Sequence, residues 1–173
     1  DYTTSGALKL ALGGFSSSAV GLVAGATFIA AAMELTGLHK RLALFIMSKV
    51  GTKTKSLVFG TIVVSIVLAL FVPSATARAG TILPILLGIV AAFNLPKTSR
   101  LSALLIVTAV QSISIWNVGI KTAAAQNMVA LGFIEETFGI NITWGLWFIY
   151  AGPWSILMSV LLFFLMNKLI KPE

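Results

Sequence analysis

The stretch Val72-Pro73-Ser74-Ala75-Thr76-Ala77-Arg78-Ala79-Gly80 decides how this chain is interpreted, because it places a proline, two hydroxyl groups and a charge between apolar runs. The flanking runs, 56–72 and 81–93, are short for membrane crossings, which need about 20 apolar residues each. Basic residues lie on both outer sides of the pair, so the chain enters and leaves the membrane on one side. Two full spans would satisfy this, but the short arms and the Arg78-bearing turn favour a re-entrant hairpin over residues 56–94.

The composition excludes a soluble protein. Of the 173 residues, 58% are hydrophobic and 10% are charged, and the mean hydropathy is +1.01, whereas soluble domains carry about 25% charged residues. The net charge of +7 does not indicate nucleic-acid binding, because the basic residues stand between apolar runs, as topology signals do. With no cysteine, one histidine and no catalytic motif, the chain is predicted to be neither an enzyme nor a protein with a resident metal centre.

The remaining apolar runs complete an all-α integral membrane protein with a single transmembrane region, residues 1–173. We expect the basic clusters to face the cytoplasm and the acidic loop 135–141 to face outward, in a multi-pass protein of the cell (inner) membrane. The predicted elements are a span at 19–36, an interfacial helix at 38–55, the hairpin at 56–94, a discontinuous span at 101–134 and a span at 144–167.

The hairpin turn is the first candidate site. Ser74 and Thr76 can cap a helix that begins near Ala77, and the N-terminus of a helix carries roughly half a positive charge. Such an end suits a carboxylate or a phosphate. The alternative is a plain turn between two spans.

The second candidate site is the polar break 119–127 within what would otherwise be one helix. Secondary transporters bind substrate and ions at such discontinuous helices. A lysine at the bilayer centre costs about 2.5–3.5 kcal/mol, so Lys121 is expected to face an anionic substrate. Alternatively, the helix ends near Val118 and the lysine reaches an interface.

Four motifs follow one another in the order found in the divalent anion sodium symporter family, which comprises di- and tricarboxylate transporters. They are Gly14-Phe15-Ser16-Ser17, Thr36-Gly37-Leu38, the stretch 72–80 and Thr122-Ala123-Ala124-Ala125-Gln126-Asn127. The resemblance implies a transporter of two inverted repeats, each with a re-entrant hairpin and an unwound helix. This chain resembles the first repeat, about half a transporter, so a missing second half and a homodimer are implied.

The resemblance also implies roles for residues. The candidate substrate-binding residues are Ser74, Ala75, Thr76, Lys121, Thr122 and Asn127, and the candidate sodium-binding residues are Ser74, Gly119 and Ala123. Ala75 stands where the family has Asn, and Ala123 and Ala124 stand where it has Gly and Ser or Thr. A sodium site built here would therefore have fewer oxygen ligands, and the stretch 76–80 resembles the exchanger branch.

The predicted function is secondary active transport of di- or tricarboxylates of the citrate, succinate, malate and 2-oxoglutarate class. Exchange by alternating access is favoured, with Lys121 supplying a fixed charge where sodium-coupled relatives use a cation. The alternatives are a sodium-coupled dicarboxylate symporter, an inorganic oxyanion or proton antiporter, and a non-transporting membrane subunit. Besides sodium, no cofactor is expected.

Overall fold

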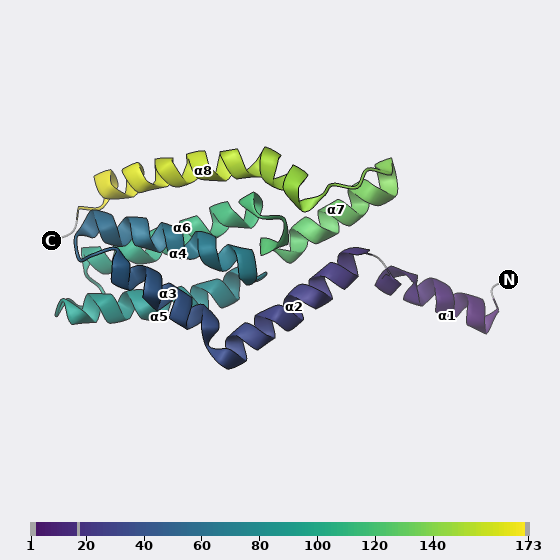
Figure 1. Cartoon of the computed structure of the whole chain (residues 1–173), viewed down its shortest axis with the longest axis horizontal. Helices are drawn as coiled ribbons and strands as arrows, with labels where there is room; N and C mark the ends of the chain where they lie inside the picture. The colour runs from purple at the N-terminus through teal and green to yellow at the C-terminus, as the bar shows by residue number, and fades with distance from the viewer. Residues whose placement is uncertain (1–2, 17, 172–173) are drawn as a thin grey trace.

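The computed structural model describes residues 3–16 and 18–171, and within these ranges every regular element is helical. Figure 1 shows α3, α4, α5, α6 and α8 lying lengthwise beside one another, while α2 and α1 extend away from them. The helices are α1 (Thr4–Gly13), α2 (Ser18–Thr36), α3 (Leu38–Lys49), α4 (Thr54–Phe71), α5 (Ala75–Ala92), α6 (Arg100–Gly119), α7 (Ala125–Phe138) and α8 (Trp144–Leu169), with short 3-10 turns η1 (Gly14–Ser16) and η2 (Lys121–Ala123).

Helix α6 is the centre of the bundle, packing against α4, α5 and α8. Its Leu104, Leu105 and Ala109 are fully buried, and hydroxyl side chains lie among them. The Thr108 hydroxyl donates to the Leu104 carbonyl one turn earlier, at 2.7 Å, so this polar group is buried without leaving its hydrogen-bonding capacity unmet. The Ser102 and Ser112 hydroxyls of the same helix are buried without a partner among the described residues.

Four helices are long and apolar enough to cross a membrane by length and composition, namely α4, α5, α6 and α8. This establishes the all-α membrane architecture that the composition predicts. In α2 the described apolar part, Val23–Thr36, is shorter than these four. Whether 19–36 crosses the membrane and whether 38–55 lies at its surface stay predictions.

The hairpin arms are longer than the sequence suggests. The expectation of a short second arm at 81–93 is wrong, because α5 begins at Ala75 and includes the polar stretch up to Gly80. Each arm has 18 residues, about 27 Å at 1.5 Å per residue. The turn between them is only Val72-Pro73-Ser74. Length alone therefore does not distinguish a re-entrant hairpin from two spans, and the hairpin stays a prediction.

The region 101–134 forms two helices rather than one. Helix α6 ends at Gly119, η2 follows, and α7 begins at Ala125. Ile120 and Ala124 have extended backbone on either side of η2, so the chain is unwound on both sides of Lys121–Ala123.

Gly119 allows α6 and α8 to approach closely. A β-carbon at this position would lie 2.6 Å from Ser155 Oγ, 2.7 Å from Ser155 Cβ and 2.9 Å from Trp116 Cε3. Such close contacts between small residues are typical of helix pairs in membranes.

We expect Gly119→Ala to lower the stability of the protein by about 1–3 kcal/mol, because overpacking forces neighbouring side chains to shift. Thermal unfolding in detergent measures the effect. Gly88→Ala is the matched control, since nothing lies within 4 Å of a β-carbon there. Equal melting temperatures for the two variants would contradict the packing argument.

Candidate functional site

The α4–α5 turn and the α6–α7 break meet in the structure. Arg78, in the first turn of α5, donates from Nη2 to the Asn117 side-chain oxygen at the end of α6. The same nitrogen donates to the Ala123 carbonyl in η2, at 3.0 Å. We call the turn 72–74, the break 120–124 and Arg78 together the two-loop site. The family resemblance implies that both loops contribute to one site, and the Arg78 guanidinium donates to both of them.

Arg78 is fully buried, with 0% of its surface exposed. Its Nε donates to the Ser74 carbonyl at 3.4 Å, while Nη1 is buried without a hydrogen-bond partner among the described residues. A buried cation with an unused donor has a strong preference for an anionic or carbonyl oxygen nearby. The two-loop site therefore has a fixed positive charge and one guanidinium nitrogen, Nη1, that has no acceptor among the described residues.

The α5 N-terminus agrees in part with the capping prediction. The Ser74 side chain accepts a hydrogen bond from the Ala77 backbone N–H at 3.3 Å and is half-buried. Thr76 is exposed and lies inside the first turn, so it is not the cap. Ala75 is half-buried beside it. The exposed Thr76 hydroxyl lies at the positive end of the α5 dipole.

Asn127 holds the end of α6 in place. Its side-chain amide donates to the Asn117 carbonyl at 2.7 Å, and lies 3.3 Å from the Ile120 carbonyl and 3.4 Å from the Lys121 carbonyl. The Asn117 carbonyl lies in the last turn of α6, where carbonyl groups lack helical donors, whereas the Ile120 carbonyl also accepts from the Ala123 N–H at 3.0 Å. The residue predicted to contact substrate thus stabilises the backbone of the break.

Lys121 contacts the loop before α8. Its half-buried ammonium group donates to the Ile142 carbonyl at 2.5 Å. Trp147, one turn into α8, donates its indole N–H to the Val118 carbonyl at 2.9 Å. Both bonds link the break to the start of α8. The role of Lys121 toward an anionic substrate stays a prediction, and Arg78 is the buried charge of the site.

The candidate sodium ligands differ in whether their oxygen atoms are already engaged. The Ala123 carbonyl already accepts from Arg78, and Gly119 is buried against Ser155. Within residues 3–16 and 18–171, no three His, Cys, Asp or Glu side chains form a group that could hold a metal. A sodium ion here would depend on hydroxyl and carbonyl oxygens. It would lie close to the Arg78 guanidinium, which would repel it because both are positively charged.

Two of the cavities between α2 and the two-loop site are lined by both Pro73 and Thr122. The first, about 80 Å³, is lined by Thr27, Pro73, Thr122 and Met128 among others. The second, about 370 Å³, is lined by Ala26, Pro73 and Thr122 together with apolar residues of α2 and α4. Thr122, predicted as a substrate contact, therefore opens onto the same space as the hairpin turn.

Arg78 and Asn117 are the site residues that sequence reasoning missed. The sequence does contain a signal for Arg78, namely its position between two apolar runs. Placing an arginine in an apolar region costs free energy, so such a residue is expected to have a specific partner. Ser17, part of the first quoted motif, lies outside the described residues.

Comparison with known proteins gives the class of the chain. The family model described as the sodium:sulfate symporter transmembrane region matches residues 1–173. A membrane protein of Cupriavidus necator is 51% identical over 172 residues, covering 99% of this chain and 34% of that protein. The citrate/succinate antiporter of Escherichia coli K12 is 36% identical over 172 residues, covering 96% and 35%. The L-tartrate/succinate antiporter of Escherichia coli UTI89 is 28% identical over 174 residues, covering 98% and 36%.

Two of these relatives are named antiporters, which are transporters and not enzymes. The chain belongs to the sodium:sulfate symporter family, which confirms the resemblance found in its motifs and its place in a multi-pass membrane protein. It spans about a third of the length of the curated relatives that it matches.

We expect Asn127→Ala to destabilise the protein by about 1–3 kcal/mol, because it leaves carbonyl groups at the end of α6 without a donor. Thermal unfolding of the detergent-solubilised protein measures this loss. Gln126→Ala is the matched control, because Gln126 is exposed and adjacent. If both variants unfold at the same temperature, the amide of Asn127 does not hold the break.

Proposed function

We propose that the protein containing this chain exchanges di- or tricarboxylates across the inner membrane by alternating access, with the two-loop site binding a carboxylate group. The buried Arg78 guanidinium, with its unused Nη1, is the observation that carries this proposal. The antiporter names of two relatives support the substrate class. We further propose that the working unit includes a second repeat and forms a homodimer.

A carboxylate suits the site for geometric reasons. The Nε and Nη2 of Arg78 already donate to protein oxygens, so its unused Nη1 can donate to one oxygen of a carboxylate in a charge-assisted hydrogen bond. The Thr76 hydroxyl and the α5 N-terminus supply further donors at the adjoining turn. Pro73 and Thr122 border a common cavity in which the remainder of the substrate could lie. Thr76 and Thr122 are thus proposed as substrate contacts, whereas Ser74 and Asn127 orient the backbone.

Exchange is favoured over sodium coupling by the position of the charge. Arg78 donates to the Ala123 carbonyl, an oxygen that a sodium ion would otherwise use. A permanent cation offsets the charge of the substrate without an ion gradient. The empty carrier then has an uncompensated buried charge, which opposes its reorientation without substrate. Arg78 accordingly takes the role that the sequence suggested for Lys121.

A second candidate function is sodium-driven transport of an inorganic oxyanion. The description of the matching family, a sodium:sulfate symporter region, favours it. In that case a bound cation would have to lie beside Ser74 and Gly119, with backbone carbonyls supplying the oxygens.

We expect Arg78→Gln to reduce citrate or succinate counterflow by at least about a hundredfold, because loss of hydrogen bonds to a charged group costs about 1.5–3 kcal/mol and the offsetting charge is lost as well. Counterflow of labelled substrate in vesicles containing the full-length protein measures this. Arg100→Gln, at the exposed start of α6, is the matched control. Arg78→Lys, which keeps the charge, should retain part of the activity.

The same vesicles distinguish the two candidate functions. Counterflow by the unmodified protein should not change when sodium is replaced by potassium. Uptake of labelled substrate into vesicles that contain no internal carboxylate, driven by a sodium gradient, would show that exchange is the wrong mechanism.

We also propose that 56–94 is a re-entrant hairpin open to the cytoplasm. Residues 1–173 contain no cysteine, so Ser74→Cys and Thr76→Cys provide single labelling sites once any cysteine in the rest of the protein is replaced by serine. We expect both to be protected from membrane-impermeant thiol reagents by citrate. Rapid labelling from outside in every state, with or without citrate, would place the turn in an external loop.

A further inference from the structure

A cavity of about 370 Å³ lies at the opposite end of α4 from the two-loop site. It is formed where α3 ends, where α4 begins and where α8 passes alongside, and its lining residues are Lys49, Val50, Lys55, Ser56, Phe59 and Phe163. None of these residues belongs to the transport site described above.

The walls of this cavity are held together by close packing. A β-carbon on Gly60 would lie 2.5 Å from Val50 Cγ2, so α3 and α4 are in direct backbone-to-side-chain contact here. The turn between these helices passes through Gly51, whose φ of 78° is readily adopted by glycine. The backbone of the two lysines is thereby placed on neighbouring helix ends, and the Lys49 ammonium group lies 5.7 Å from the centre of the Phe45 ring.

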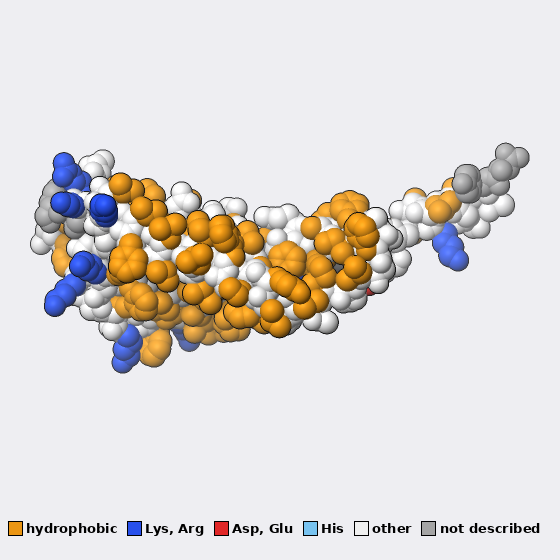
Figure 2. All heavy atoms as spheres, turned by 90° about the horizontal axis from the view of Figure 1, so that it is seen from above, with side chains coloured by type: hydrophobic (Ala, Val, Ile, Leu, Met, Phe, Trp, Pro, Cys, Tyr) orange, Lys and Arg blue, Asp and Glu red, His pale blue; other side chains and the backbone are white. Residues whose placement is uncertain are grey.

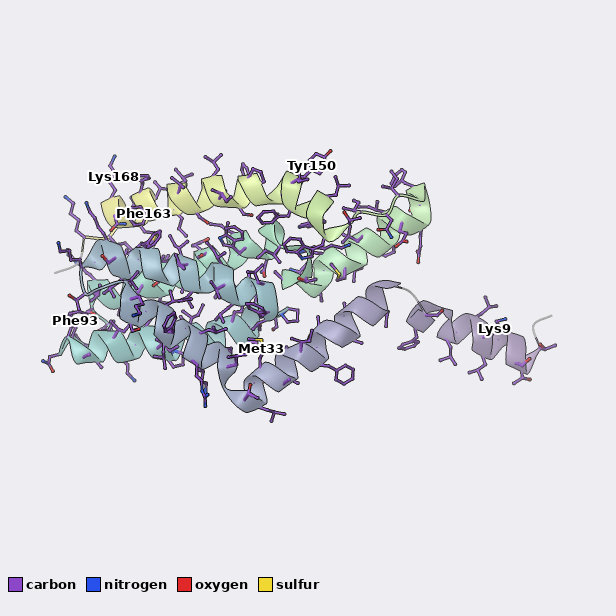
Figure 3. All side chains as sticks on the ribbon, viewed as in Figure 1. Lys9, Met33, Phe93, Tyr150, Phe163 and Lys168 are labelled. Atoms are coloured by element: carbon purple, nitrogen blue, oxygen red, sulfur yellow. The ribbon has the colours of Figure 1, made fainter. Side chains whose placement is uncertain are left out.

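The cavity has a cationic rim and an aromatic floor. Lys49 and Lys55 are exposed at the rim. Beneath them the rings of Phe59 and Phe163 meet edge to face, with centroids 6.5 Å apart. Phe59 is 54% exposed, so its ring remains available to an apolar ligand. Figure 3 shows Phe163 and Lys168 near the same end of α8.

The surrounding surface is basic. Figure 2 shows lysine and arginine side chains gathered at one end of the molecule, with hydrophobic side chains covering the length next to it. The basic residues in the segments at this end are Lys49, Lys53, Lys55, Lys97, Arg100, Lys168 and Lys171. The described acidic residues lie elsewhere, in α2 and α7.

We propose that this cavity binds the headgroup of an anionic glycerophospholipid. The lysine ammonium groups and the Ser56 hydroxyl donate to the lipid phosphate, and an acyl chain lies against the Phe59 ring. Basic pockets between membrane helices are suited to anionic headgroups. The cavity is charged at its rim and aromatic beneath, in the same order as the headgroup and the acyl chain of a lipid. Free phosphate would use the lysines but would gain nothing from the aromatic floor.

The test uses the full-length protein purified in detergent and titrated with phosphatidylglycerol or phosphatidylcholine, with bound lipid counted by native mass spectrometry. We expect tighter binding of phosphatidylglycerol. The double variant Lys49→Gln/Lys55→Gln should bind it roughly 30-fold more weakly, since each lysine near an anionic surface favours binding about fivefold. The matched control is Lys53→Gln/Lys97→Gln, which removes the same charge from the same end outside the cavity.

Phe59→Ala separates the lipid from free phosphate. It should weaken phosphatidylglycerol binding while leaving the protein folded, because the ring is half exposed. Three results would overturn the proposal. The two double variants could weaken lipid binding equally, or Lys49→Gln/Lys55→Gln could leave lipid binding unchanged. The third such result is displacement of the lipid by millimolar inorganic phosphate. The first indicates a diffuse surface charge, the second a cavity covered by the rest of the protein, and the third a phosphate site.

Discussion

The hydrogen bonds from the buried Arg78 guanidinium to the α6–α7 break are the interaction on which the rest of the structure depends. They connect two irregular segments, each of which would otherwise expose backbone carbonyl or amide groups at the end of a helix. Irregular backbone within a membrane is tolerated only where protein or water satisfies it. Conversely, an arginine in this setting is retained only with such partners. The charge and the two breaks therefore stabilise one another.

Part of this arrangement follows from the sequence and part does not. Apolar runs indicated where α2, α4, α6 and α8 lie, and the polar stretches 72–80 and 119–127 indicated both interruptions. Helix α1 was not predicted, and the expected helix 38–55 is divided between α3 and the start of α4. The apolar run 81–93 underestimated the second hairpin arm, whereas the capping residues predicted a helix start near Ala77, two residues after the observed start at Ala75. The stretch 75–80 is helical because Ser74 caps its N-terminus and the Arg78 side chain is buried against α6.

The partners of the polar side chains could not be obtained from sequence spacing. Arg78 meets Asn117 and Ala123 across 39 and 45 residues of chain, and Lys121 meets Ile142 across 21. Local patterns fix which face of a helix is apolar, but not which helix lies opposite. For Lys121, spacing predicts a charge within the polar break but not its contact with the loop before α8, and its role toward a substrate stays a prediction.

The indole groups at the α6–α7 break give the protein a built-in optical reporter. Trp116 donates to the Ser159 hydroxyl and Trp147 to the Val118 carbonyl, each at 2.9 Å, so two of the four tryptophans are held on either side of the last turn of α6. Indole emission depends on hydrogen bonding and local polarity, and buried indoles keep their N–H partners. A rearrangement of the break should therefore change the intrinsic fluorescence, and occupancy of the two-loop site could be followed without an attached dye.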